Sequence, residues 1–281
     1  MYYKIENENL TCEINEMGAE LHSLKSKSNN KEYIWQGNPD IWYGQAPILF
    51  PVIGQLNSDR YYLNGIEYHL PKHGFARKML FENIFCEGNK AVFLLKNNSQ
   101  TMKMFPFEFE LYAEFVLEGN SVINTLTVKN KSVNKMYFSI GAHPAFNCKV
   151  GDIIEFETAE TVCTERIDKT NMLIDQKFPC LDNESRIIIT KEIFEPDALI
   201  LSGLKSKKLK LKGENEIEFT FGDCPVLGIW AKPGAPYVCI EPWYGINDRH
   251  EPVDDISEKR EIRALDAGNS FEFSWKAEVI K

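Results

Sequence analysis

The sequence lacks the signals of secretion, membrane insertion and cysteine-based stabilisation. Its 281 residues include seven cysteines, an odd number at scattered positions with no C-x-x-C pair. A disulfide framework or a zinc ribbon is therefore disfavoured, and a reducing compartment is expected. Segment 1–6 has no apolar signal-peptide core, and no uncharged apolar run could span a bilayer. These absences predict a cytoplasmic protein without a membrane partner.

Motifs for common cofactors and nucleophiles are missing as well. The chain contains no G-x-G-x-x-G, no G-K-[ST] phosphate loop and no G-x-S-x-G elbow. His250 and Glu251 lack the second histidine of a zinc-protease helix. Dinucleotide, P-loop, serine-hydrolase and zincin chemistry are therefore disfavoured. The sequence predicts an enzyme that uses side chains alone, with no cofactor and no metal.

The charge balance is acidic, with 41 acidic and 32 basic side chains and a net charge of −9. A chain of this sign repels a phosphate backbone, so nucleic acid is not expected as a partner. The one basic run, 205–212, alternates lysine with leucine in its second half. This pattern predicts a strand with a solvated lysine face.

An alternation of apolar and polar residues with period two dominates the chain. It is clearest in 107–117, 122–128 and 271–279, where it predicts antiparallel strands with one apolar face. Four turn signals separate such segments: Asn64-Gly65, Gly88-Asn89, Gly119-Asn120 and Gly213–Asn215. Helical turns are expected only at 39–43, 101–105 and 254–259. The fold class is therefore predicted to be all-β, a sandwich of large antiparallel sheets over residues 1–281 in a single domain.

Two histidines and one glutamate stand in settings that suit chemistry. His73 and His143 are flanked by glycine, alanine and proline, which leave room for a ligand near each ring. Glu241 ends an apolar segment and is followed by Pro242 and Trp243. A buried carboxylate is costly unless it is paired or used, and an indole beside it suits a sugar face. Taken singly, each histidine could be structural and the glutamate could be an exposed strand end.

Five segments in this order resemble the aldose 1-epimerase (galactose mutarotase) family, and most closely its compact bacterial branch. They are Pro47–Gly54, Lys72–Arg77, Gly141–Phe146, Asp197–Leu201 and Ile240–Gly245. The resemblance implies a supersandwich of antiparallel sheets that holds a sugar in a cleft. It also implies that Glu241 is the general base, that His143 is the general acid, and that His73 and Asp197 bind the sugar.

The resemblance further implies an aldose 1-epimerase, an isomerase that interconverts the α and β anomers of a free aldohexose. Further substrate contacts are expected from Phe75, Arg77 and Trp243, with Tyr244 as a second candidate for stacking. The chain has Gln55 where the family often has arginine. An amide can bond a hydroxyl but supplies no positive charge. The expected assembly is a monomer or a weak homodimer.

Three alternatives remain open from the sequence. One is a hexose-6-phosphate mutarotase, which needs a cationic pocket. The second is a non-catalytic carbohydrate-binding protein on the same fold, although a pure binder has no need of a base. The third is a metal site built from His73, His143 and Glu241, which have suitable residue types.

Overall fold

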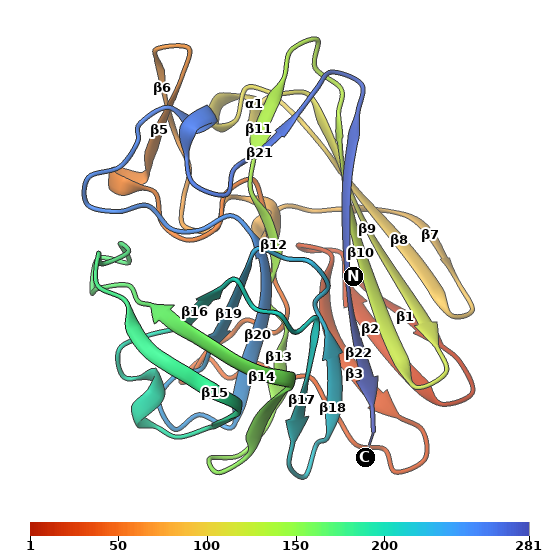
Figure 1. Cartoon of the computed structure of the whole chain (residues 1–281). Helices are drawn as coiled ribbons and strands as arrows, with labels where there is room; N and C mark the ends of the chain where they lie inside the picture. Colours follow the sequence, from red (N-terminus) through yellow and green to blue (C-terminus); the bar gives the residue numbers. More distant parts are fainter. Residues whose placement is uncertain (281) are drawn as a thin grey trace.

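The computed structural model, which describes residues 1–280, is built almost entirely of antiparallel strands (Figure 1). The chain opens with a three-stranded sheet of β1 (Tyr2–Glu6), β2 (Leu10–Asn15) and β3 (Glu20–Ser26). Two small ribbons pair β5 (Arg60–Leu63) with β6 (Ile66–His69), and β11 (Met136–Phe138) with β21 (Arg263–Leu265). The all-β class predicted from the alternating pattern is confirmed.

The remaining strands form one sheet of 15 strands. Its order is β4 (Ile48–Leu49), β12 (Ile140–Ala142), β20 (Tyr237–Tyr244), β19 (Val226–Trp230), β16 (Leu199–Ser202), β14 (Ile153–Glu165), β17 (Lys208–Lys212), β18 (Ile217–Thr220), β22 (Ser270–Val279), β10 (Ser121–Asn130), β9 (Phe109–Glu118), β8 (Lys90–Lys96) and β7 (Glu82–Glu87). Two strands branch from this path: β13 (Ala145–Asn147) pairs with β20, and β15 (Phe178–Ile188) pairs with β14.

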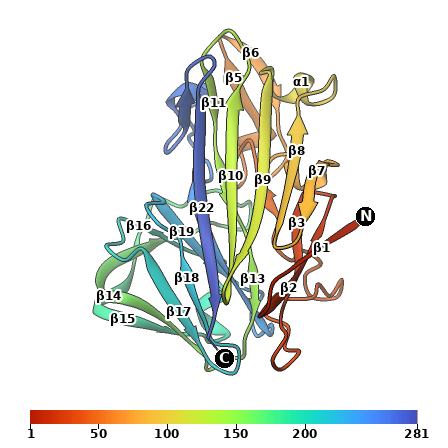
Figure 2. The same cartoon turned by 90° about the vertical axis from the view of Figure 1, so that its right-hand side faces the viewer.

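The strands β9, β10 and β22 show why these segments extend. Their side chains alternate between buried and more exposed, so one face of the sheet packs on the core. Leu126 of β10 lies opposite Ala113 on one side and Phe273 on the other. Figure 2 shows these long strands side by side with β7 and β8. The register thus stacks apolar side chains in rows across the sheet.

The predicted turns are confirmed. Asn64-Gly65, Gly88-Asn89 and Gly119-Asn120 each connect two paired strands, as does the segment 213–216. The lysine run forms β17, whose leucines are buried and whose lysines are partly exposed. Each of these hairpins follows from local sequence alone, because the turn residues fix the register.

Helices are short. They are α1 (Thr101–Met104) and the 3-10 turns η1 (Asn57–Asp59), η2 (Ala76–Lys78), η3 (Glu192–Phe194) and η4 (Ile256–Glu258). Two of the expected helical turns are confirmed as α1 and η4. The third, at 39–43, is wrong: the chain there makes a turn closed by a bridge between Asn38 and Trp42, and the Asn38 side chain accepts from the Asp40 amide at 2.9 Å. Along residues 1–280, no helix is both long enough and apolar enough to cross a membrane.

Candidate active site

Strand β20 carries Glu241 into the interior of the protein. It pairs with β19 along one edge and with β12 and β13 along the other, so seven of its eight residues are buried. Glu241 is 1% exposed. An ionised carboxylate in such a place is unfavourable unless polar partners face it.

His143 is the partner that faces Glu241. It lies in the two-residue connection between β12 and β13, and both of these strands pair with β20. The His143 Nε2 atom is 3.1 Å from Glu241 Oε2. Trp243 Nε1 donates to the same oxygen at 3.2 Å. Glu241 Oε1 accepts no hydrogen bond from the part of the chain that the structure describes, so it remains available to a ligand.

Aromatic rings hold the His143 imidazole in place. Trp42 stacks on it with centroids 5.2 Å apart, and Trp230 meets its edge at 5.8 Å. The His73 ring lies nearly perpendicular to it, with centroids 5.9 Å apart. The ring therefore has little freedom to turn away from Glu241.

Burial shifts the pKa values of His143 and Glu241 in opposite directions. It lowers the pKa of His143 to about 3, and the positive charges of Arg77 and Lys72 add to this effect. Burial also raises the pKa of Glu241 well above its ordinary value, and the charge of Asp197 acts in the same direction. These directions favour a neutral imidazole beside a protonated carboxyl in the free site, so the single proton must pass to His143 before Glu241 can act as a base.

His73 reaches the site from a strained turn. Its φ is +64° and that of Gly74 is +68°, both in the left-handed region. A Cβ on Gly74 would lie 2.2 Å from the Phe50 carbonyl oxygen, so only glycine fits there. His73 Nδ1 accepts from the Gly54 amide at 3.1 Å. Because burial holds the pKa of His73 well below its ordinary value, the neutral ring carries its proton on Nε2, where it can donate to a ligand.

Asp197 is also held in an unusual backbone conformation. It has a φ of +69° and lies between η3 and β16. Its Oδ1 accepts from the Ala198 amide at 2.7 Å, and Arg166 donates to its carbonyl oxygen at 2.6 Å. Strained residues of this kind concentrate at ligand sites, where the surrounding structure fixes them.

These side chains line one cavity of about 180 Å³. The predicted residues found there are Glu241, His143, His73, Asp197, Arg77 and Trp243. The cavity walls also contain Trp42, Lys72, Ile167, Ala198, Ile200, Trp230 and Asn247, which sequence reasoning did not select. Lys72 could have been found from its place beside His73, whereas no local pattern marks Trp42, Trp230 or Asn247.

Three other candidates lie outside this cavity. The Gln55 amide donates to the Asp59 carboxylate and, at 3.4 Å, to the Leu56 carbonyl. Phe75 is 4% exposed and packs in the core against Phe50, Phe105 and Phe109. Tyr244 packs on Phe271 and Phe273. Each of these three side chains already contacts neighbouring protein groups, and their expected sugar contacts stay predictions.

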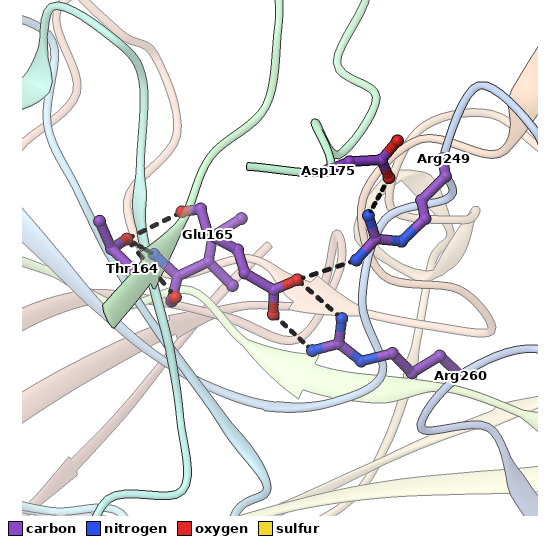
Figure 3. Close-up of polar contacts among 6 residues, drawn as sticks. Thr164, Glu165, Asp175, Arg249 and Arg260 are labelled. Carbon is purple, nitrogen blue, oxygen red and sulfur yellow. Dashed lines mark hydrogen bonds and ion pairs between the residues drawn. The ribbon is translucent and has the colours of Figure 1, made fainter. Parts of the chain in front are cut away.

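An ionic cluster around Glu165 supports one wall of the cavity (Figure 3). Arg260 binds both oxygens of this 2%-exposed carboxylate, at 2.8 and 2.6 Å, and Arg249 adds a contact at 3.2 Å. Arg249 also pairs with Asp175. The cluster thus ties the end of β14 to the segments 166–175 and 245–260, which carry Ile167 and Asn247 to the cavity.

We expect Arg260→Ala to lower the free energy of unfolding by about 3 kcal/mol, because it leaves the Glu165 carboxylate buried with a single remaining partner. Arg249→Ala is the matched control. It keeps both Arg260 hydrogen bonds and loses a partly exposed contact, for which about 1 kcal/mol or less is expected. Urea unfolding of the three proteins measures the difference, and equal losses for both variants would contradict this role of the cluster.

Comparison with known proteins identifies the family. The sequence matches the family model described as aldose 1-epimerase over residues 1–240. The chain belongs to the aldose 1-epimerase family. The matched region includes His73, His143 and Asp197 and stops immediately before Glu241. The family match therefore does not cover Glu241, which lies beside His143 in the cavity.

Individual relatives agree with this assignment. The plasmid-encoded protein LacX of Lactococcus lactis subsp. lactis is 30% identical, in an alignment that covers 93% of this chain and 94% of LacX. A galactose mutarotase related enzyme from Lactobacillus acidophilus is 33% identical with a TM-score of 0.95, covering 100% of this chain and 98% of the other. A galactose mutarotase-like protein from Lactobacillus casei ATCC 334 is 29% identical with a TM-score of 0.94, covering all of both chains. These similarities confirm the galactose mutarotase-like fold that the sequence motifs implied.

Proposed function

We propose that this protein is an aldose 1-epimerase that interconverts the α and β anomers of a free aldose. The observation that carries the proposal is the His143–Glu241 pair, 3.1 Å apart in the wall of a cavity rimmed by indoles. Mutarotation must move protons at two oxygens, the C1 hydroxyl and the ring oxygen. Both oxygens are bonded to C1, so the acid and the base must also lie close together.

In the proposed reaction, Glu241 takes the proton of the C1 hydroxyl while His143 gives a proton to the ring oxygen. The bond from C1 to the ring oxygen breaks and leaves an open-chain aldehyde. After rotation about C1–C2, the ring oxygen attacks the other face of the aldehyde. His143 recovers its proton from the ring oxygen and Glu241 returns one to O1. The pair begins and ends with the same single proton.

The other cavity residues suit the binding of a sugar ring. His73 offers an N–H donor and Asp197 a carboxylate acceptor, and the Asn247 side chain lies in the same wall. Trp42, Trp230 and Trp243 present indole faces or edges, which favour the C–H surface of a pyranose. In this arrangement the hydroxyls find polar partners and the ring faces find apolar ones.

The proposal is tested by polarimetry on freshly dissolved α-glucose, α-galactose and other free aldoses. We expect the purified protein to speed equilibration of at least one of them far above the uncatalysed rate. Binding of a sugar without any acceleration would instead establish the carbohydrate-binding alternative.

The pH dependence of kcat/KM follows from the shifted pKa values of His143 and Glu241. The active form holds one proton, so activity falls when the pair gains a second proton or loses the first. Because burial lowers the pKa of His143 to about 3, the acid limb of the profile is expected well below pH 6.5, the ordinary value for histidine. An acid limb centred near 6.5 would contradict this prediction.

A second candidate is an aldose with an anionic group, such as a hexose 6-phosphate, and one observation favours it. Lys72 and Arg77 both line the cavity, and neither makes an ion pair with a carboxylate of residues 1–280. The buried Arg77 Nε atom has no hydrogen-bond partner there. Two cations without counterions could hold a phosphate.

The two candidates are separated by comparing kcat/KM for glucose and glucose 6-phosphate. If the cations serve a phosphate, Arg77→Gln lowers kcat/KM for the phosphorylated sugar at least tenfold more than for the free sugar, which corresponds to about 1.4 kcal/mol of selective binding. Arg60→Gln, at an exposed arginine outside the cavity, is the control and should change kcat/KM for neither sugar. Equal effects of Arg77→Gln on both sugars would remove the phosphate candidate.

A further inference from the structure

A buried thiol that the proposed reaction does not use lies beside the acid–base pair. Cys239 precedes Glu241 by two residues on β20, so both side chains point to the same face of the sheet. Cys239 is fully buried and makes no disulfide. Ligand atoms of His143, Cys239 and Glu241 all lie within 4.8 Å of one another.

These three residue types are the ligands of zinc sites. Zinc binds imidazole nitrogen, thiolate sulfur and carboxylate oxygen at about 2.0–2.3 Å in a tetrahedral arrangement. Ligand atoms around a tetrahedral ion lie about 3.3–3.8 Å from one another, so the separations, which extend to 4.8 Å here, must shorten by up to about 1 Å to enclose one ion. Calcium and magnesium need six or more oxygen ligands, and this group offers a single carboxylate. The set therefore favours a zinc-class ion.

Charge also favours such an ion. Binding releases the protons of the Cys239 thiol and the Glu241 carboxyl, because only the deprotonated groups are ligands. A divalent cation balances the two negative charges that result, and the neutral imidazole completes three ligands. His143 and Glu241 line the cavity and Cys239 does not, so an ion that enters from the cavity meets the pair first and the sulfur behind it. The fourth ligand position is open to water.

The sequence predicted no metal, and the metal site left open there as an alternative was a different one. It combined His73 with His143 and Glu241, but His73 does not belong to the ligand group formed by the described residues. Its Nδ1 accepts from the Gly54 amide, and its ring meets His143 edge-on. Cys239 takes its place, because the two-residue repeat of a strand sets it beside Glu241.

We propose that His143, Cys239 and Glu241 form a binding site for a zinc-class divalent cation that reversibly blocks the sugar site. As an inhibitory device it rests on the proposed mutarotase function, whereas metal binding itself does not. The bound ion would hold the two atoms that move protons, and the sugar could not use them. Lys72 and Arg77 repel a cation from the same cavity, so the affinity should be lower than that of a structural zinc site.

The binding test is a titration of the reduced, metal-free protein with Cd²⁺, followed by the thiolate-to-cadmium charge-transfer absorption. We expect the wild type to show one equivalent of absorbing Cd²⁺ that Cys239→Ala, His143→Asn and Glu241→Gln all lack. Cys148→Ala removes another buried free thiol and is the matched control, which should titrate like the wild type. Identical titrations of the wild type and Cys239→Ala would overturn the site. So would a Cys239-dependent signal that survives in both the His143 and the Glu241 variants.

The inhibition test uses Zn²⁺ in the mutarotation assay. We expect Zn²⁺ to inhibit the wild type competitively with sugar, and Cys239→Ala to need at least tenfold more Zn²⁺ for the same inhibition. Cys239→Ser nearly keeps the side-chain volume and therefore controls for a packing defect. It should show the same loss of sensitivity to Zn²⁺. Equal sensitivity in all three proteins would refute the inhibitory role. If the wild type does not catalyse mutarotation, the proposed function fails while the Cd²⁺ titration still decides the metal site.

Discussion

Replacing Glu241 with glutamine is expected to lower kcat/KM for mutarotation by about 10²–10⁴-fold, the usual contribution of one positioned proton-transfer group. The amide can still accept the hydrogen bond from Trp243, so the strand and the cavity keep their shape. It cannot take a proton from the C1 hydroxyl. Glu118→Gln, at the exposed end of β9, is the matched control and should keep the wild-type rate.

The same variant should be more stable than the wild type at neutral pH. The pKa of Glu241 is raised in the folded protein, chiefly by burial, above its ordinary value of 4.5. The stability that the protonated Glu241 carboxyl contributes is therefore present below pH 4.5. It is lost as the pH rises through the raised pKa of this group in the folded protein. Glu241→Gln removes this loss, so its Tm should exceed that of the wild type at pH 7. A large fall in Tm would instead mean that the carboxylate is structural.

Replacing His143 with asparagine is the second change with a large expected effect, again about 10²–10⁴-fold in kcat/KM. Asparagine is shorter and does not exchange protons with the ring oxygen. The exposed His69, changed to asparagine, is the matched control and should leave the rate unchanged. Both proteins are compared with the wild type by polarimetry on the same aldose.

The double variant distinguishes a working pair from two separate contributions. Groups that act as one unit give non-additive losses, because either substitution alone disables the unit. We therefore expect Glu241→Gln with His143→Asn to be little slower than the slower single variant. A double variant whose loss equals the product of the two single losses would contradict a joint role.

The fold was predictable where alternation and turn residues in one short segment determine the local structure. Alternation in 107–117, 122–128 and 271–279 identified the strands β9, β10 and β22, and glycine with asparagine identified the hairpin turns between paired strands. The helical turn expected at 39–43 did not form, because the Asn38 side chain caps the backbone and closes a turn instead. Which strands lie side by side in the 15-stranded sheet could not be predicted, since those pairings join segments far apart in the sequence.

The site residues were predictable where a short motif carries a residue that faces the cavity. His73, His143, Asp197 and Glu241 were selected from such motifs, and the structure brings all four to one cavity. Gln55 and Phe75 were selected from the same motifs, yet their side chains turn to Asp59 and to the aromatic core. Trp42 and Trp230 were missed because their positions beside His143 depend on long-range packing.

Anomer exchange at equilibrium tests the central claim most directly. In two-dimensional exchange NMR of galactose or another accepted aldose, cross-peaks join the α and β anomeric protons when the anomers interconvert during the mixing time. With a small amount of wild-type protein we expect strong cross-peaks, and with the Glu241→Gln, His143→Asn double variant none above those of the protein-free sample. Cross-peaks of equal strength for the wild type and the double variant would contradict the assignment of this pair to the reaction.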